Sequence, residues 1–545
     1  MKAIRPLRTL ALLACSALVL SACDSGAAGG ADPGRPVSGG TLTYAVNSEP
    51  VNLDPHASPQ DVTALFARPV LDSLVSMDAD GRIRPWLAKS WSVSADGKTY
   101  TFTLREGVTF HDGTPFDAEA VKANLDHVVD PKTKSEMAAG YIEPYRGTKV
   151  TGPHTVAVSL ERPHAPFLAA LSTAYLGIQS PAALRRGAES ISRKLVGSGP
   201  FVMENFTPRK GAEYRRNEGY DWAPGTRSRK GPARLKGLEL QVVTEDSARV
   251  GALTSGQVDA IAQVPPSAVR QVDSDPRLRT AKHQAPGGAY TYYPNTGAGV
   301  FKDVRVRRAF RDGIDFTTVV KELYFGAFDR AHAPLSPSTP GAPPVPRKLG
   351  YDPKGAAKLL DEAGWDERDD QGYRTKEGSR LTVRWPFVQA SGAREQRSTL
   401  AAQIQAEAKE LGIELKLVEG TLNELIQRYS KGDYDLMDLS WTRADGDALR
   451  NLFHSDSIAT PEKFGQNAAR YDDEETDSLL EEALTNSDPE RREQLYGQVQ
   501  GRVAAESAAF PVYVTNAVVG VSDKVQGLGW DPQAYPTFDD AWRAP

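Results

Sequence analysis

The sequence predicts an α/β protein, and two segments far apart in the chain carry that prediction. Near residues 238–262, an apolar strand pattern is followed by a helical pattern and then by a second short strand. The same alternation recurs over residues 381–441, with three strands and two helices. Strands that alternate with helices imply parallel crossover units. We therefore expect two α/β regions, with the proline-rich stretch 334–346 between them as a surface loop.

The other expected elements follow from the same two periodicities. Apolar and polar residues that alternate predict a strand, and apolar residues three to four positions apart predict a helix. Asp117 stands where an N-cap residue would stand, just before a helical pattern. We expect strands over 41–46, 98–104 and 510–514, and helices over 62–75, 118–129, 474–485 and 489–506.

The N-terminus has the features of a secretory leader. Lys2, Arg5 and Arg8 precede an apolar run of about 11 residues, which is short for a membrane span and fits the apolar part of a signal peptide. The run ends in Leu20-Ser21-Ala22-Cys23, which resembles a bacterial lipobox. This resemblance implies cleavage after residue 22 and a diacylglyceryl group on Cys23.

Residues 24–39 are rich in Gly, Ala, Ser, Pro and Asp and show no apolar periodicity. Such a composition is typical of a flexible tether. No other stretch approaches the 18 or more apolar residues of a spanning helix. We therefore expect the folded part to be lipid-anchored at the extracytoplasmic face of a bacterial cell membrane.

Composition and charge exclude several classes of protein. The chain has 545 residues, too many for one compact core, and 25% of them are charged. A net charge of −5 argues against nucleic acid as a partner. Cys15 and Cys23 are the only cysteines, so neither a disulfide framework nor a cysteine-based zinc site is expected.

Catalytic motifs are absent from the sequence. It has no H-E-x-x-H and no G-x-S-x-G motif, and its eight histidines show no ligand spacing. We therefore expect no enzyme activity, no cofactor and no bound metal ion. His454, which closely follows the candidate ligand loop described next, is expected to be a solvated loop residue.

A candidate ligand site follows the strand predicted over residues 436–441. Trp441 ends this strand, and Thr442, Asp445 and Asp447 follow it. Ligands of open α/β sheets lie beyond the carboxyl ends of parallel strands. An indole wall beside carboxylates suits an ammonium or guanidinium group. The alternative is a core tryptophan, with Asp447 as the cap of the next helix.

Several motifs resemble those of the family 5 solute-binding proteins of bacterial ABC importers, the dipeptide, oligopeptide and nickel class. They run in the order of the family from about Gly40 to the C-terminus. The most specific is Leu104-Arg105-Glu106-Gly107-Val108-Thr109-Phe110-His111-Asp112-Gly113-Thr114-Pro115-Phe116, and others are Gly197-Ser198-Gly199-Pro200-Phe201 and Pro511-Val512-Tyr513.

The resemblance implies a two-lobed fold of the periplasmic-binding-protein type (type II), with an additional inserted domain and the ligand cleft between the lobes. Hinge closure would then enclose the ligand. The implied division is a signal peptide at 1–22, a lipidated tether at 23–39, a discontinuous first lobe at 40–78, 196–285 and 510–545, an inserted domain at 79–195, and a second lobe at 286–509.

The resemblance also implies a function, namely capture of a short peptide or peptide-like solute and its delivery to an ABC permease and its ATPase subunits, by a monomer. Ser58 and Gln60, in a stretch that resembles the family's other ligand-lining loop, would contribute from the opposite lobe. In dipeptide binders an Asp after the strand-end Trp pairs with the peptide amine. Here Ala444 holds the matching position, and a shift of one residue would let Asp445 serve.

Several alternatives remain at this point, and one of them is a signalling or extracytoplasmic chaperone role on the same scaffold. The same fold could bind a non-peptide solute, such as an oligosaccharide or a metal chelate. A secreted hydrolase is a further alternative, against which the missing nucleophile and metal motifs count.

Overall fold

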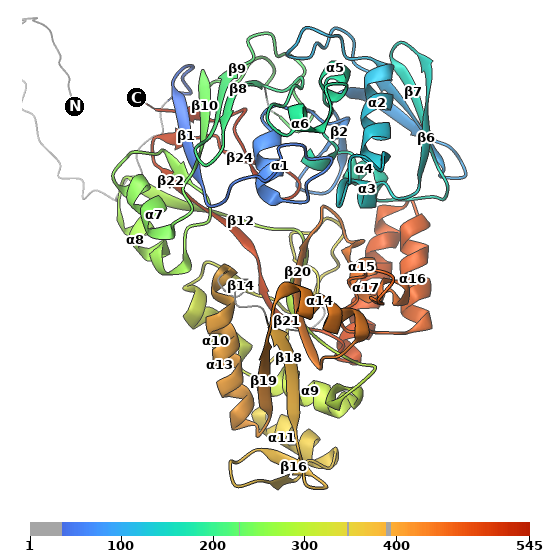
Figure 1. The fold of residues 1–545 in the computed structure, drawn as a ribbon, viewed down its shortest axis with the longest axis vertical. Helices are drawn as coiled ribbons and strands as arrows, with labels where there is room; N and C mark the ends of the chain where they lie inside the picture. The colour runs from blue at the N-terminus through green and yellow to red at the C-terminus, as the bar shows by residue number, and fades with distance from the viewer. Residues whose placement is uncertain (1–34, 228, 346–347, 388–393, 545) are drawn as a thin grey trace, which may run out of the picture. The chain divides into compact units, whose positions relative to one another are not determined.

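The computed structural model describes residues 35–227, 229–345, 348–387 and 394–544. The predicted signal peptide, Cys23 and most of the tether lie outside these residues. Pro36–Pro545 forms one unit of the fold, which Figure 1 traces from its N-terminus to its C-terminus. Within the described part of the chain, no helix combines the length and the apolar character needed to cross a membrane.

A seven-stranded mixed sheet organises the first part of the fold (Figure 1). Its central strand, β1 (Thr41–Val46), runs parallel to both of its neighbours, and every other pairing in the sheet is antiparallel. The helix α7 (Asp246–Thr254) connects those two neighbours and confirms the strand, helix and strand predicted near 238–262. In spatial order the strands are β12 (Leu278–Gln284), β22 (Asn516–Ser522), β11 (Ala260–Ile261), β1, β10 (Gly237–Val242), β9 (Gly211–Arg216) and β8 (Phe201–Thr207).

A separate antiparallel sheet lies within the segment 79–195, and its apolar core also includes residues from outside that segment, such as Leu74 and Trp222. Its spatial order is β4 (Ala88–Val93), β5 (Thr99–Leu104), β7 (Thr155–Leu160) and β6 (Tyr145–Gly152). The helix α2 (Ala118–Val129) begins at Asp117, whose side chain accepts the amide hydrogen of Ala120 at 2.9 Å. The predicted cap is therefore confirmed. Smaller helices here are α3 (Ala138–Tyr141), α4 (Phe167–Ala170), α5 (Pro181–Leu184) and α6 (Ala188–Ile191).

The second α/β region differs from its prediction in one respect. Strands β18 (Thr382–Phe387) and β19 (Glu414–Glu419) pair in parallel, as the alternation predicts. The third strand, β20 (Leu436–Thr442), forms its ladder with β13 (Gly287–Pro294) instead, and that ladder is antiparallel. The side chain of Asp435, just before β20, accepts the amide hydrogen of Arg384 at 2.8 Å, so β20 starts beside β18 without joining its ladder.

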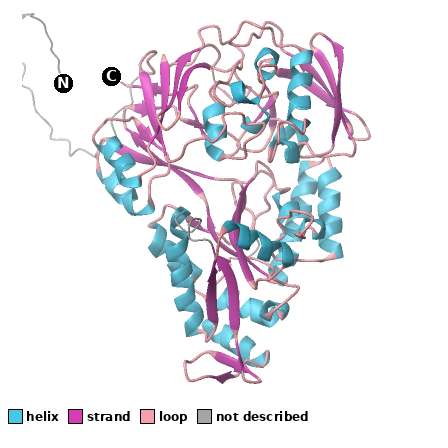
Figure 2. Cartoon of the chain, in the orientation of Figure 1, coloured by secondary structure: helices cyan, strands magenta, loops and turns pink. Residues whose placement is uncertain are grey.

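Helices flank these strands on both sides (Figure 2). The sheet that contains β13 has the order β14 (Asp329–Arg330), β21 (Phe510–Val514), β13 and β20. The helices of this region are α9 (Val304–Gly313), α10 (Phe316–Tyr324), α11 (Pro353–Glu362), α13 (Arg397–Glu410), α14 (Leu422–Lys431), α15 (Ala448–Phe453), α16 (Glu474–Thr485) and α17 (Pro489–Ala505).

The chain passes between the two large sheets at two adjacent connections. Strand β12 leads directly into β13, and β21 leads directly into β22. The Ala285 amide donates to the Thr515 carbonyl at 2.9 Å, so the two connections are held side by side. The predicted division assigned all of 510–545 to the first lobe, but β21 pairs with β13 of the second sheet. The change of sheet therefore falls after Val514 and not before Phe510.

Two local predictions are wrong. The helix expected over 62–75 ends early, because α1 spans Asp61–Ala67 and β2 (Val75–Met77) follows. Pro69 lacks the amide hydrogen that a continuing helix would need. The proline-rich stretch 334–346 is not wholly a surface loop. Its residue Leu335 is buried and forms a bridge to Gly288 in β13.

We predict that loss of the α2 cap destabilises the fold. Asp117→Ala removes the acceptor of the Ala120 amide hydrogen and should lower the free energy of unfolding by about 1 kcal/mol. Asp117→Asn keeps an acceptor at the same place and should cost much less. Denaturant midpoints measured by circular dichroism compare the two. Equal losses in both variants would contradict a capping role for the side-chain oxygen.

Candidate functional site

The loop after β20 carries a buried cation, Arg443, to the helix α3. The Arg443 side chain is 7% exposed, and its guanidinium lies 5.0 Å from the centroid of the Tyr141 ring. Tyr141 ends α3, within the segment predicted as the inserted domain. An arginine over an aromatic face is attracted by the ring quadrupole, most strongly where water is excluded. This contact joins the candidate ligand loop to a residue far earlier in the chain.

A glycine fixes the position of this loop. Gly287 has a φ of +100°, and a Cβ built on it would lie 2.3 Å from the Trp441 carbonyl oxygen and 2.4 Å from the Arg443 amide nitrogen. No side chain fits in that space. The first residues of β13 therefore lie directly against the backbone of the loop, and Gly288 pairs with Trp441 in the ladder.

The opposite wall of the site is aromatic. The rings of Tyr141 and Tyr175 are 6.1 Å apart and nearly perpendicular. The Tyr175 hydroxyl donates to the carbonyl oxygen of Pro59 at 3.2 Å, and the Tyr535 hydroxyl donates to Asp61 at 2.6 Å. The tyrosines thus tie the start of α1 and the loop before it to the segment around Tyr175 and to the C-terminal segment.

Carboxylates from both sides of the site act on Tyr141. Burial is the main cause that raises the pKa of Tyr141 to about 12. The negative charges of Asp445 and Asp61 raise this pKa further, and the Arg443 charge opposes them. Asp445 follows β20 and Asp61 begins α1, so the fold brings together acidic residues that are almost 400 positions apart.

Asp447 is buried in an environment that disfavours its charge. Asp447 is 3% exposed, and its Oδ1 has no hydrogen-bond partner among the described residues. Burial and the neighbouring Asp445 raise the pKa of Asp447 above its usual range, while Arg443 and Arg450 act in the opposite direction. Asp447 stands at the N-cap position of α15, but its side chain accepts no capping hydrogen bond there.

Trp441 and Thr442 are both partly exposed. The indole Nε1 of Trp441 is buried and has no hydrogen-bond partner among the described residues. Trp441 is therefore not a fully enclosed core residue, and it keeps an unused donor beside the loop.

Ser58 and Gln60 use their polar atoms within their own loop. The Ser58 hydroxyl lies 2.9 Å from the Thr63 hydroxyl, and the Gln60 side-chain oxygen accepts the Val51 amide hydrogen at 2.9 Å. These bonds hold the segment that leads into α1. The neighbours Pro59 and Asp61 make the contacts with the tyrosines.

Sequence reasoning missed most of the site's aromatic residues. Tyr141, Tyr175 and Tyr535 stand in no pattern that marks a site. Arg443 lies within the predicted ligand loop 441–447, and Asp61 directly follows Gln60. Both could therefore have been predicted as site residues from the sequence.

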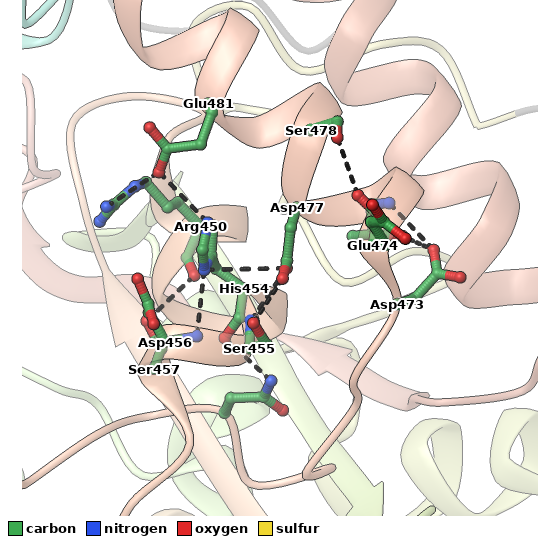
Figure 3. Close-up of polar contacts among 12 residues, drawn as sticks. Arg450, His454, Ser455, Asp456, Ser457, Asp473, Glu474, Asp477, Ser478 and Glu481 are labelled. Carbon is green, nitrogen blue, oxygen red and sulfur yellow. Dashed lines mark hydrogen bonds and ion pairs between the residues drawn. The ribbon is translucent and has the colours of Figure 1, made fainter.

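His454 contributes to packing between helices (Figure 3). Its Nε2 lies 3.2 Å from a carboxylate oxygen of Glu481, and its Nδ1 accepts the Asp456 amide hydrogen at 3.1 Å. The Ser455 amide donates to Asp477 at 2.9 Å. These contacts fasten the end of α15 to α16. His454 is 6% exposed, so the expectation of a solvated loop residue is wrong.

A cavity of about 220 Å³ lies apart from the candidate ligand loop. Arg68, Trp86, Tyr220, Arg227 and Asp531 are among its lining residues, and the Arg68 guanidinium lies 5.3 Å from the centroid of the Trp86 ring. None of the ligand residues predicted from the sequence lines it.

Comparison with known proteins identifies relatives along almost the whole chain. Residues 82–487 match the model of the bacterial extracellular solute-binding proteins, family 5. Heme-binding protein A of Haemophilus influenzae is 27% identical over 566 residues, which cover 98% of either chain. The glutathione-binding protein GsiB of Escherichia coli K12 is 27% identical over 503 residues, which cover 92% of this chain and 94% of the relative.

A solved structure shows the same architecture. The crystal structure of NikA from Brucella suis in complex with Fe(III)-EDTA superposes with a TM-score of 0.81 at 25% sequence identity. The match covers 92% of this chain and all of the other. The expected fold class, a two-lobed α/β fold of the periplasmic-binding-protein type, is therefore confirmed.

We predict a pH-dependent effect of Asp447→Asn on stability. Because the pKa of Asp447 is raised, the folded state holds a proton that the unfolded state releases above about pH 4. This contribution makes the free energy of unfolding fall as the pH rises above that value. Asparagine removes it, so the stability of the variant relative to the parent should increase between pH 5 and pH 8.

Urea unfolding at the two pH values measures this difference. Asp472→Asn is the matched control, because it removes the same charge from an exposed position. The control should show no pH-dependent difference from the parent. The same stability difference for Asp447→Asn at both pH values would show that the buried carboxylate has an ordinary pKa.

Proposed function

The chain belongs to the bacterial extracellular solute-binding proteins of family 5, and we propose that it captures a short peptide or a peptide-like solute with a cationic group for an ABC importer. The solute would lie between the lobes, against the loop that follows β20. Closure of the lobes would enclose it, and a membrane permease with its ATPase subunits would receive it. The protein would act as a monomer and would catalyse no reaction.

One observation carries the proposal about the solute. Asp445 and Asp61 come from opposite sides of the site, and both act on the buried Tyr141. The described cations near this loop are Arg443 and Arg450, and the Arg443 charge is opposed by Asp445 and Asp447. The partly exposed carboxylate of Asp445, just after β20, suits a solute that brings a positive charge. The partly exposed Trp441 would supply apolar surface for the rest of the solute.

The relatives are consistent with a peptide-like solute without deciding it. One is named for glutathione, which is a tripeptide, and another for heme. The NikA structure holds a metal chelate. A chelate or another non-peptide solute on the same fold is therefore the competing proposal. Native mass spectrometry of the purified protein distinguishes them, because a co-purified solute reveals its mass directly.

We predict that Asp445→Asn weakens binding of the identified solute. A charge-assisted hydrogen bond in a closed cleft contributes about 1.5–3 kcal/mol, so the dissociation constant should rise by about 10- to 150-fold. Isothermal titration calorimetry measures this change. Asp447→Asn should weaken binding less, since burial raises the pKa of Asp447 and disfavours its charged form.

Asp472→Asn again serves as the control, because it removes the same charge from an exposed position and should leave the affinity unchanged. Unchanged affinity in both the Asp445 and the Asp447 variants would refute the charge anchor. It would leave the assignment as a binding protein intact.

We also propose that Cys23 carries the lipid that holds the protein at the membrane. The support is the ordered leader, with Lys2, Arg5 and Arg8, an apolar run and Leu20-Ser21-Ala22-Cys23.

Cys23→Ser should release the protein from the membrane fraction, because the acceptor thiol is lost. Cell fractionation followed by immunoblotting measures the distribution, with Ser21→Ala as a control that keeps a small residue in the motif and should stay with the membranes. A Cys23→Ser protein that still sediments with membranes would contradict the lipid anchor.

A further inference from the structure

An aspartate and a histidine two positions apart meet a distant histidine in the interior of the first half of the fold. One potential ligand atom from each of Asp54, His56 and His127 lies within 4.8 Å of the other two. Asp54 and His56 are 2% and 1% exposed, and they precede α1. His127 lies in the last turn of α2, and its side chain is 19% exposed.

The Asp54 carboxylate is oriented by donors on one of its oxygens. Its Oδ1 accepts the His56 amide hydrogen at 3.0 Å and the Gln179 side-chain amide hydrogen at 2.9 Å. The other oxygen, Oδ2, faces Nε2 of His127 at 3.1 Å. One oxygen is thus held in place, and the other points to the histidine.

His56 presents an unused lone pair. Its Nε2 lies 2.9 Å from the Gly177 carbonyl oxygen, which can only accept, so Nε2 carries the hydrogen. In the neutral ring Nδ1 is then an acceptor. This atom is buried and has no hydrogen-bond partner among the described residues.

The contacts of His127 set its tautomer. The Thr133 hydroxyl donates its single hydrogen to the His127 carbonyl oxygen at 2.6 Å. The hydroxyl oxygen therefore accepts from His127 Nδ1, which lies 3.2 Å away. With its hydrogen on Nδ1, the neutral ring turns the lone pair of Nε2 toward the Asp54 carboxylate. Two lone pairs 3.1 Å apart need either a hydrogen on Nε2 or a cation between them.

Two features of this cluster are unsatisfied: the facing lone pairs of His127 Nε2 and Asp54 Oδ2, and the unpartnered Nδ1 of His56. A proton on His127 Nε2 would satisfy only the first. It would pair His127 with Asp54 and leave His56 Nδ1 without a partner. A metal ion would accept all three lone pairs. Metal-bound histidines and carboxylates usually have a second hydrogen-bond partner besides the metal. Here His56 has a backbone carbonyl, His127 has a hydroxyl, and Asp54 has two amide donors.

We propose that Asp54 Oδ2, His56 Nδ1 and His127 Nε2 bind a divalent transition metal ion of the Zn²⁺ type. Two imidazoles and one carboxylate are a ligand set that suits zinc, with water in the fourth position. The partly exposed His127 would be the side from which the ion and this water enter. The sequence expectation of no bound metal rested on spacing along the chain, which does not register ligands from separate elements.

Such an ion would hold the loop before α1 in place. Asp54 and His56 belong to this loop, and His127 belongs to α2. The Gln179 segment is tied to α2 as well, because the side chain of Asn124 bonds to both the amide and the carbonyl of Gln179 at 2.8 Å. The same loop continues to Asp61 at the candidate ligand site. The ion would therefore be a resident structural metal and not the transported solute.

Calorimetric titration of the mature protein with ZnCl₂, after removal of metals with EDTA and dialysis, tests the proposal. We expect one strongly bound Zn²⁺ per chain and a higher melting temperature in its presence. His127→Gln should weaken Zn²⁺ binding by more than about 10-fold, the scale on which even outer partners act. Circular dichroism of the metal-free variant shows whether it is folded, and His56→Gln provides a second ligand variant.

His454→Gln is the matched control. His454 is also buried and lies near Asp477 and Glu481, so it is the competing place for an ion. This control should bind Zn²⁺ as the parent does. Co²⁺ in place of Zn²⁺ should give visible absorption bands that disappear in folded His127→Gln protein. Absence of strong binding, retention of binding in His127→Gln, or its loss only in His454→Gln would each overturn the proposal.

Discussion

Burial of the Arg443 guanidinium is the constraint on which the candidate site depends. A cation removed from water is costly unless charges and hydrogen-bond acceptors surround it. Asp445 supplies negative charge from the same loop, and the Tyr141 ring covers one side of the guanidinium. The acidic residue beside Arg443 and its contact with Tyr141 both meet this need.

The start of β13 supports the backbone of the ligand loop, which the site also requires. Because Gly287 has no Cβ, β13 approaches the backbone of Trp441 and Arg443 closely enough to hold it. Gly287 also stands just after the connection from β12 to β13, which runs beside the one from β21 to β22. The place where the chain passes between the sheets therefore adjoins the loop that carries Asp445. A movement of one sheet relative to the other would act directly on the ligand loop.

The proposed metal ion and the candidate ligand site share one segment of chain. The loop before α1 carries Asp54 and His56 at its start and Asp61 at its end. Hydrogen bonds from Ser58 and Gln60 hold the residues between them. Because these atoms of Ser58 and Gln60 are already paired, the two residues act on the site through the backbone conformation that their hydrogen bonds hold. This explains why the tyrosines contact the neighbours of Ser58 and Gln60.

Local patterns in the sequence determined a large part of this protein. Periodicity identified both α/β regions, the strands 41–46 and 510–514, and the helix that Asp117 caps, because these depend on residues a few positions apart. The motif order indicated the family, and the Trp441 segment was identified from its position at a strand end. Only the tertiary structure decided that β20 pairs with β13, that Tyr141, Tyr175 and Tyr535 form one wall, and that His127 meets Asp54 and His56. Each of these contacts joins residues from separate elements. A contact with a residue far away in the chain creates no periodic pattern in the sequence around either residue.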